Sequence, residues 1–162
     1  MKAALEVERK FLVAHLPDLS AARAEVIRQG YLTGKGDSVE IRLRQKGDKY
    51  FQTLKKGSGL ERLECETEIS QTQFEQFWPA SKGQRLEKTR WTGALPDGHV
   101  FELDIFDGAL AGFKLVEVEF RDIKEARAYE PPNWFGRDVT SDPAFFNAML
   151  ASEGLPYPPF QL

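Results

Sequence analysis

The stretch that most constrains this chain is its first predicted strand, which runs from Leu5 to Phe11. Successive side chains of a strand point to opposite faces, so Glu6, Glu8 and Lys10 share one face while the opposite face is apolar. Two carboxylates on one face repel each other unless a cation or a basic neighbour offsets them. The strand therefore favours a charged interior or groove that binds a metal ion.

The same alternation recurs along the chain between turns that contain Gly or Pro. Gly47-Asp48 and Pro96-Asp97-Gly98 predict the turns of two hairpins. Further strands are expected at residues 26–33, 38–46, 49–56, 60–69, 84–92, 100–106 and 114–121. Helices are expected at residues 71–78 with Ser70 as N-cap and Pro79 as terminator, at 123–129, and from Asp142-Pro143 onward.

Charged side chains of both signs collect on one face of these strands, and the other face is almost entirely aliphatic or aromatic. The charged set is Glu6, Glu8, Lys10, Arg42, Arg44, Lys55, Glu64, Glu66, Lys88, Arg90, Glu102, Asp104, Glu117 and Glu119. Glu40, Lys46 and Glu68 share this face but lie near strand ends, so they are left out of the predicted site.

About eight antiparallel strands can close into a barrel with a narrow interior. If the charged faces pointed outward, the amphipathic helices that carry Phe74, Phe77, Phe145 and Phe146 would have nothing to cover. We therefore predict a mainly β (α+β) fold, a closed antiparallel eight-stranded β-barrel with a charged interior and helices packed on the outside. Buried charges persist when they are paired or bind a ligand, and both signs are present here.

The two signs are segregated along the chain. Glu6 and Glu8 come from the first strand and Glu117 and Glu119 from the last, which are neighbours in a closed sheet, with Asp104 on the preceding strand. Such carboxylates suit a hard divalent cation, Mg²⁺ or Mn²⁺. The basic side chains are of the kind that clamps phosphate oxygens, and they are Arg42, Arg44, Lys55, Lys88 and Arg90. A polyphosphate chain bridged by metal fits this combination.

Taken in order, these motifs resemble the CYTH superfamily, the triphosphate tunnel metalloenzymes. Glu6, Glu8 and Lys10 match its E-x-E-x-K motif, and Arg42 and Arg44 match its R-x-R motif. Lys55 matches its strand lysine, and Lys88 and Arg90 match its K-x-R motif. Glu117 and Glu119 match its late E-x-E motif, and Glu64 and Glu66 match an acidic pair of bacterial members. The resemblance runs from about Leu5 through the last strand. The Pro-Pro-x-Trp-Phe-Gly stretch and the final helix resemble the tail of short bacterial members.

The resemblance implies hydrolysis of inorganic tripolyphosphate to pyrophosphate and phosphate, dependent on Mg²⁺ or Mn²⁺. It implies metal ligands at Glu6, Glu8, Glu117 and Glu119, with Asp104 as a further candidate, and triphosphate ligands at Lys10, Arg42, Arg44, Lys55, Lys88 and Arg90. Lys10 and Tyr31 match positions that assist catalysis in some members. Glu64 and Glu66 are both candidates for the carboxylate that orients the attacking water.

Other activities of the same family are alternatives: a nucleoside or thiamine triphosphatase, or a class IV-like adenylate cyclase. A cyclase needs adenine recognition, and we find no residues that specify it. A rival from another class is a non-catalytic polyphosphate-binding module, which catalytic turnover would exclude. No P-loop, C-x-x-C or H-E-x-x-H motif is present.

Length and composition limit the remaining function classes. The 162 residues fit one domain, 1–162, and a net charge of −3 argues against nucleic-acid binding through overall basicity. Cys65 is the only cysteine, which excludes an internal disulfide and fits a reducing compartment. No apolar signal region or membrane-length apolar run is found. We expect a cytoplasmic protein with a small-molecule polyphosphate substrate and no membrane partner, and the sequence leaves open a monomer or a homodimer.

Overall fold

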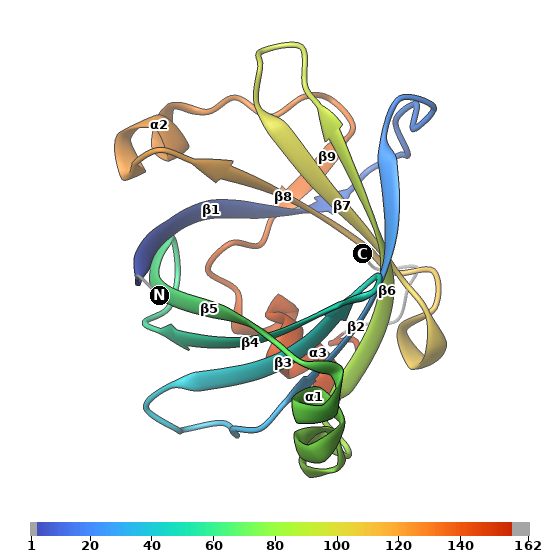
Figure 1. Ribbon diagram of the computed structural model, residues 1–162. Coiled ribbons are helices and arrows are strands. Elements are labelled where there is room, and N and C mark those ends of the chain that lie inside the picture. Colours follow the sequence, from blue (N-terminus) through green and yellow to red (C-terminus); the bar gives the residue numbers. More distant parts are fainter. Residues whose placement is uncertain (1–2, 157–162) are drawn as a thin grey trace.

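The sheet of this protein closes on itself. In the computed structural model, which describes residues 3–156, nine strands pair in the order β5-β4-β3-β2-β6-β7-β8-β1-β9, and β5 pairs again with β1 (Figure 1). All pairings are antiparallel, so β1–β8 form a closed barrel and β9 lies outside it. The predicted eight-stranded barrel is confirmed. The strands are β1 (Ala4–Val13), β2 (Arg23–Tyr31), β3 (Glu40–Lys46), β4 (Lys49–Lys56), β5 (Glu61–Ile69), β6 (Arg85–Ala94), β7 (Val100–Phe106), β8 (Lys114–Phe120) and β9 (Phe135–Asp138).

The predicted strands differ most from the structure at β2 and β9. β2 begins at Arg23 rather than at residue 26, and the chain turns before β3 because the Gly34 N–H donates to the Asp37 carboxylate at 2.7 Å. Strand β9 was not predicted, since its four residues, Phe-Gly-Arg-Asp, lack a sustained alternation. The predicted domain also covers residues 1–2 and 157–162, which lie outside the described residues.

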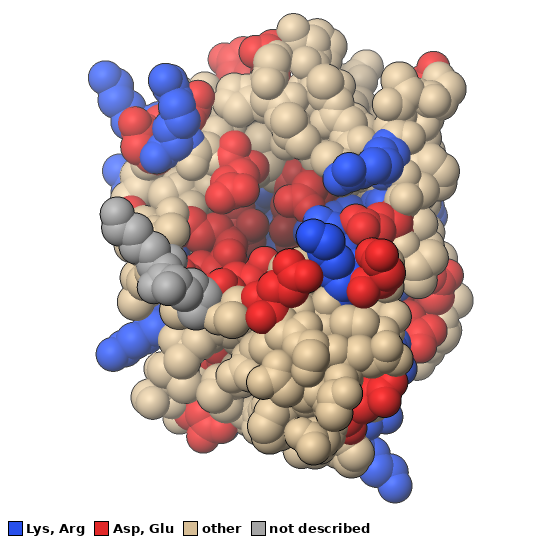
Figure 2. Space-filling model, in the orientation of Figure 1, with Lys and Arg blue, Asp and Glu red and all other residues tan. Residues whose placement is uncertain are grey.

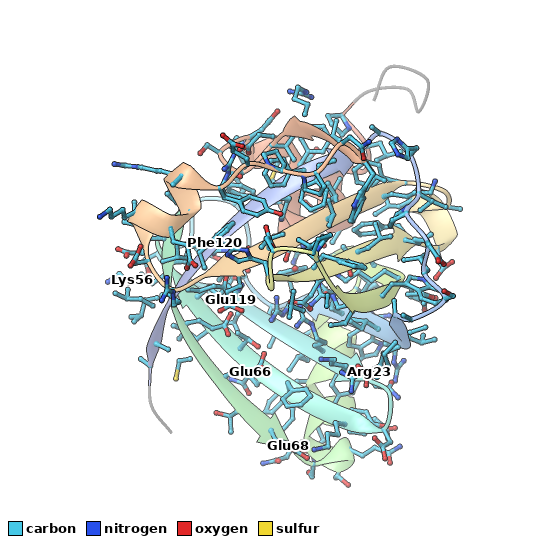
Figure 3. The ribbon with its side chains drawn as sticks, turned by 90° about the horizontal axis from the view of Figure 1, so that it is seen from above. Arg23, Lys56, Glu66, Glu68, Glu119 and Phe120 are labelled. Atoms are coloured by element: carbon cyan, nitrogen blue, oxygen red, sulfur yellow. The ribbon has the colours of Figure 1, made fainter. Side chains whose placement is uncertain are left out.

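The charged faces of the strands point into the barrel, as predicted. Figure 3 shows Glu66 of β5 and Glu119 of β8 directed into the space between the strands, whereas Phe120 points the opposite way. Because Phe120 follows Glu119 directly, this view illustrates the period-2 alternation that sends successive side chains of a strand to the inner and the outer face of the barrel.

The outer faces of β1 and β6–β8 are covered by α2 (Ile123–Ala128) and the segment that leads to β9. Asp122 caps α2 by accepting from the Glu125 N–H at 2.8 Å. Arg9, on the outer face of β1, donates to the carbonyls of Ala126 and Tyr129 at 3.0 and 2.9 Å. This core contains Val7, Phe11, Leu95, Phe101, Leu103, Val116, Val118, Phe120, Ala126, Tyr129, Trp134 and Phe135.

A second cover lies on the outer face of β2–β4. The helix α1 (Gln71–Phe77) begins at Ser70, which forms a capping box with Gln73, and a 3₁₀ turn, η1 (Trp78–Ser81), follows. Pro79 therefore sits in the first turn of a further helical segment and does not end the helical path. Phe74 is fully buried and stacks on Trp78 at 4.9 Å, but Phe77, which we expected to pack on the sheet, is 49% exposed.

The C-terminal segment differs from its prediction. We expected one helix from Asp142-Pro143 packed on the outside of the barrel; the chain instead forms a short 3₁₀ turn, η3 (Pro143–Phe145), and then α3 (Asn147–Glu153). Figure 1 shows α3 through the opening of the barrel. Phe145 and Leu150 are buried against Leu12, Leu86, Phe106, Leu115 and their neighbours, together with Leu110 of the 3₁₀ turn η2 (Gly108–Leu110).

The C-terminal segment packs at one end of the lumen because the inward faces of the strands are not charged over their whole length. Leu12 and Leu115 continue the inward faces that carry Lys10 and Glu117, so one end of the lumen is lined by apolar side chains. Covering them removes apolar surface from water, and a buried Phe or Leu contributes roughly 1.5–3 kcal/mol.

No helix within residues 3–156 is long and apolar enough to cross a membrane.

Gly30 of β2 lies directly under η1, and this contact can be tested. A Cβ at Gly30 would meet the Ser81 Oγ at 2.5 Å and the Trp78 ring at 3.0 Å, whereas a Cβ at Gly34 would meet only the Asp37 carboxylate at 3.9 Å. We expect Gly30→Ala to lower the free energy of unfolding by about 1–3 kcal/mol because the site is overpacked. Gly34→Ala is the control and should change it by less than about 0.5 kcal/mol. Equal stabilities in urea unfolding would contradict the close approach of η1.

Candidate active site

The inward charges meet in one cavity along the barrel axis, which we call the tunnel. Figure 2 shows acidic side chains gathered around its opening, with basic side chains deeper and to one side. Its lining residues come from β1–β8 and from the C-terminal segment. They include the predicted site residues Glu6, Glu8, Lys10, Tyr31, Arg42, Arg44, Lys55, Glu64, Glu66, Arg90, Glu117 and Glu119. They also include Glu40, Lys46, Arg62, Glu102, Thr140, Phe146 and Asn147, which were not predicted site residues.

Arg42 and Arg44 of β3 form the basic wall. The Arg42 guanidinium donates to the Thr53 hydroxyl at 3.3 Å and lies 3.5 Å from the Glu66 carboxylate, which leaves its buried Nε without a partner among the described residues. Burial, together with the charges of Arg42 and Arg90, lowers the pKa of Arg44 to about 10. Arg44 is therefore a buried cation beside two other guanidinium groups, so this wall would gain from an anion.

Lys55 of β4 lies between two carboxylates. Its ammonium is 2.9 Å from the Glu6 carboxylate and 3.1 Å from that of Glu64. Burial and a hydrogen bond with Glu64 raise the pKa of Glu6, whereas the hydrogen bond with Glu6 and the charge of Lys55 lower the pKa of Glu64 against the effect of burial. Lys55 thus joins the basic wall to the acidic one.

The acidic wall is formed by β1 and β8, where Glu8 lies opposite Glu119 and Lys10 opposite Glu117. Burial, reinforced by the charges of Glu117 and Glu6, raises the pKa of Glu8 to about 8. Burial and the charge of Glu6 also raise the pKa of Glu119. For Glu117 burial acts in the same direction, but Lys10, 3.3 Å away, and Arg90 outweigh it and lower the pKa to about 2.

The acidic wall therefore fits a divalent cation in its chemistry. Glu6, Glu8 and Glu119 supply the oxygen donors that Mg²⁺ and Mn²⁺ prefer, and burial together with neighbouring carboxylates raises their pKa values. Among residues 3–156, no three Asp, Glu, His or Cys side chains are already gathered into a metal site. The fit rests on donor type and on unbalanced charge.

Asp104 and Lys88 were expected in the site, yet neither belongs to the tunnel lining. Asp104 is 1% exposed, and its two oxygens accept from Arg90 at 2.7 and 2.9 Å and from Lys88 at 2.6 Å. Burial lowers the pKa of Lys88 to about 7 against the opposing charge of Asp104. This geometry makes Asp104 a buried anchor that holds Arg90 in the tunnel wall, with Glu102 as a second partner of Arg90.

The C-terminal segment contributes the floor of the tunnel, which sequence reasoning missed. Phe146 and Asn147 line the cavity, the Lys10 ammonium donates to the Phe145 carbonyl at 3.4 Å, and Lys88 donates to the Asn147 amide oxygen at 3.3 Å. These residues carry neither charge nor strand alternation, so no signal in the sequence pointed to them.

Glu40, Lys46 and Glu68 were left out of the predicted site because they lie near strand ends. The structure places Glu40 and Lys46 in the tunnel lining. Glu68 is outside it, 3.7 Å from Lys49 in an exposed ion pair. Position near a strand end was therefore the wrong criterion for Glu40 and Lys46, because the alternation alone already put them on the inward face.

Comparison with known proteins agrees with this geometry. The family model described as "CYTH domain" matches residues 4–127. An inorganic triphosphatase of Nitrosomonas europaea is 55% identical over 146 residues, which cover 90% of this chain and 96% of that protein. An inorganic triphosphatase of Acetivibrio thermocellus is 33% identical over 158 residues, covering 96% and 97% of the two chains.

Solved structures also include proteins with a similar fold. The crystal structure of an inorganic triphosphatase is 52% identical, with a TM-score of 0.70 over 91% of this chain and 94% of that one. A putative adenylate cyclase from Bacillus halodurans shares the fold with a TM-score of 0.58 at 17% identity, over 78% and 86% of the two chains. The closed charged barrel, the family match and these relatives together show that this chain belongs to the CYTH-domain family.

Proposed function

We propose that this chain hydrolyses inorganic tripolyphosphate to pyrophosphate and phosphate with the help of a divalent cation. The observation that carries the proposal is the tunnel itself, in which an anion-seeking wall faces a wall of unbalanced carboxylates. Two relatives that match nearly the whole chain are named inorganic triphosphatases. Triphosphatases of this family are metal-dependent.

The substrate would be held by side chains from the ring of strands. Arg42, Arg44, Lys55 and Arg90 line the cavity and reach it from β3, β4 and β6, and Lys10 approaches from β1. Guanidinium groups bind phosphate oxygens in two-point contacts that an ammonium cannot copy. A linear triphosphate, which carries negative charge along its whole length, uses such a ring fully.

The carboxylates of Glu6, Glu8, Glu117 and Glu119 would hold Mg²⁺ or Mn²⁺. Such a cation would neutralise charge on the phosphate oxygens as the reaction proceeds. Glu117 already neutralises Lys10 at 3.3 Å, so it would serve as ligand and as partner of the lysine at once. Asp104 is not included, since both of its oxygens are occupied by Arg90 and Lys88.

In the reaction a water attacks the terminal phosphorus, and the bond from that phosphorus to the bridging oxygen breaks. Lys10 and Arg90 would stabilise charge that develops on the phosphate oxygens, because preorganised donors act strongly in a site shielded from water. Tyr31 would donate from the basic side. Glu64 and Glu66 are the candidates for orienting the water, and both line the tunnel.

The substrate preference tests the proposed function. The tunnel lining contains Tyr31 and Phe146 as its only rings among residues 3–156, which is a poor pocket for a nucleobase or thiamine. We expect tripolyphosphate to be hydrolysed with a higher kcat/KM than ATP or thiamine triphosphate, because an unused pocket adds nothing at the reacting phosphorus. Phosphate release and cyclic AMP formation should be measured with Mg²⁺ and with Mn²⁺. Cyclic AMP as the main product, or no turnover with either metal, would refute the assignment.

The acidic wall gives a prediction for pH. The folded-state pKa of Glu8, about 8, lies above its ordinary value of 4.5, so the folded protein keeps a proton that the unfolded chain releases. The free energy of unfolding of the metal-free protein should therefore fall as the pH rises from about 4.5 to about 8. Glu8→Gln cannot ionise, so its Tm advantage over the parent should be small at pH 5 and larger at pH 8, at about 2–4 °C for each kcal/mol.

Glu87→Gln is the control for this experiment, because Glu87 is an exposed residue of β6 on the outer face. Its Tm should follow that of the parent at both pH values. Addition of Mg²⁺ at pH 8 should raise the Tm of the parent more than that of Glu8→Gln. A Glu8→Gln advantage that does not change with pH would contradict the raised pKa of Glu8.

The basic wall gives a third prediction. Arg44→Ala should weaken tripolyphosphate binding roughly ten- to a hundredfold, since a hydrogen bond to a charged group is worth about 1.5–3 kcal/mol. Its fold should persist, because removing one of three neighbouring guanidinium groups relieves repulsion. Arg44→Lys should restore the affinity only in part. Arg127→Ala, at an exposed position of α2, is the control; calorimetry that finds the same Kd for all four proteins would place the anion site elsewhere.

A further inference from the structure

Gln29 is a fully buried glutamine that faces the tunnel side of β2, two residues before Tyr31. Its amide nitrogen donates to the Tyr31 hydroxyl at 2.7 Å, and its amide oxygen accepts from Arg44 Nε at 3.2 Å. The three side chains are linked in one chain of hydrogen bonds that begins at a guanidinium of the basic wall. Gln29 itself does not line the tunnel, so it can act on a substrate only through its two partners.

Arg44 fixes the direction of this chain. A guanidinium N–H can only donate, so the Gln29 oxygen must face Arg44 and the Gln29 NH₂ must face Tyr31. The Tyr31 oxygen therefore accepts a hydrogen bond, and its own proton must be given to another acceptor. Tyr31 lines the cavity and Gln29 does not, so the orientation of the tyrosine proton is set by a residue behind the tunnel wall.

The Tyr31 hydroxyl donates no hydrogen bond to any of residues 3–156. Its cross-strand neighbour in the lining is Arg42, which can only donate, and the Glu40 carboxylate of the lining acts on the hydroxyl through its charge without accepting a hydrogen bond from it. Burial raises the pKa of Tyr31 to about 12, so the hydroxyl keeps its proton at neutral pH. A buried donor without an acceptor is costly, and an anionic oxygen bound between Arg42 and Arg44 would satisfy it.

We infer that Gln29 is a positioning residue that holds the Tyr31 hydroxyl as a hydrogen-bond donor to a phosphate oxygen of the substrate. The inference rests on the proposed function for the nature of the anion. It assigns Tyr31 the role of donor rather than of general base, and it gives a neutral residue outside the tunnel lining a part in substrate recognition.

The test is a double-mutant cycle between Gln29 and Tyr31. In Gln29→Glu the carboxylate accepts from Arg44 and also from the Tyr31 hydroxyl, which turns the tyrosine proton away from the tunnel. We expect this variant and Tyr31→Phe each to lower kcat/KM for tripolyphosphate roughly ten- to a hundredfold. In the double variant the loss should be smaller than the two single losses combined, because the part of the Gln29 effect that passes through the hydroxyl is already absent. The same cycle is measured on the Kd of tripolyphosphate for the metal-free protein.

Two further variants keep the cycle interpretable. Gln29→Met removes the hydrogen bond to the Tyr31 hydroxyl without reversing it, so its loss should be smaller and should shrink further when Tyr31→Phe is present. It carries the test if Gln29→Glu does not fold. Gln52→Glu adds the same charge at a position of β4 next to the inward-facing Thr53, on the outer face, and should behave as the parent.

The outcomes separate this inference from the proposed function. Losses for the Gln29 variants that add to that of Tyr31→Phe would mean that Gln29 has only a structural role, and parental kcat/KM and Kd in Gln29→Glu would overturn the inference outright. A parent that binds tripolyphosphate without releasing phosphate would overturn the proposed hydrolysis, and the cycle on Kd would then decide the role of Gln29.

Discussion

The constraint on which this structure depends is the neutralisation of charge inside a closed sheet. An eight-stranded barrel has room for side chains and little else, so every inward Glu, Lys or Arg must find a partner or a ligand. Asp104 with Arg90 and Lys88 is the fully paired case, in which three buried groups satisfy one another. Such a buried cluster is strongly destabilised by the loss of one member, because the others are left unpaired.

Charges of opposite sign are less completely paired in the tunnel than in this buried cluster. Burial and the charges of Arg42 and Arg90 lower the pKa of Arg44, and burial and the charges of Glu117 and Glu6 raise the pKa of Glu8 on the opposite wall. Perturbed pKa values of both signs in one cavity are a common feature of functional sites. In the proposed function, an anion would bind at the basic wall and a cation at the acidic wall. The energetic cost of this imbalance in the free protein is what a bound metal and polyphosphate would recover.

The C-terminal segment links the fold to the site. β9 pairs with the C-terminal end of β1, and the chain then reaches the apolar end of the lumen, where Phe145 and Leu150 are buried. The same segment brings Phe146 and Asn147 into the tunnel lining and offers the Phe145 carbonyl to Lys10. One stretch of chain thus closes the barrel end, extends the hydrophobic core and positions a basic residue of the site. It also explains why the tunnel floor is built from uncharged groups.

The sequence by itself determined the barrel, its inside-out polarity and the identity of most tunnel residues, because strand alternation is a local rule that needs only neighbouring positions. It also placed Glu8 opposite the late E-x-E strand through the closure of the sheet. Tertiary structure alone decided what depends on the third dimension. The withdrawal of Asp104 and Lys88 into a buried pair, and the orientation of Tyr31 by Gln29, are set by distances between strands. The path of residues 139–147 into the lumen depends on apolar side chains contributed by four different strands, which no local pattern could reveal.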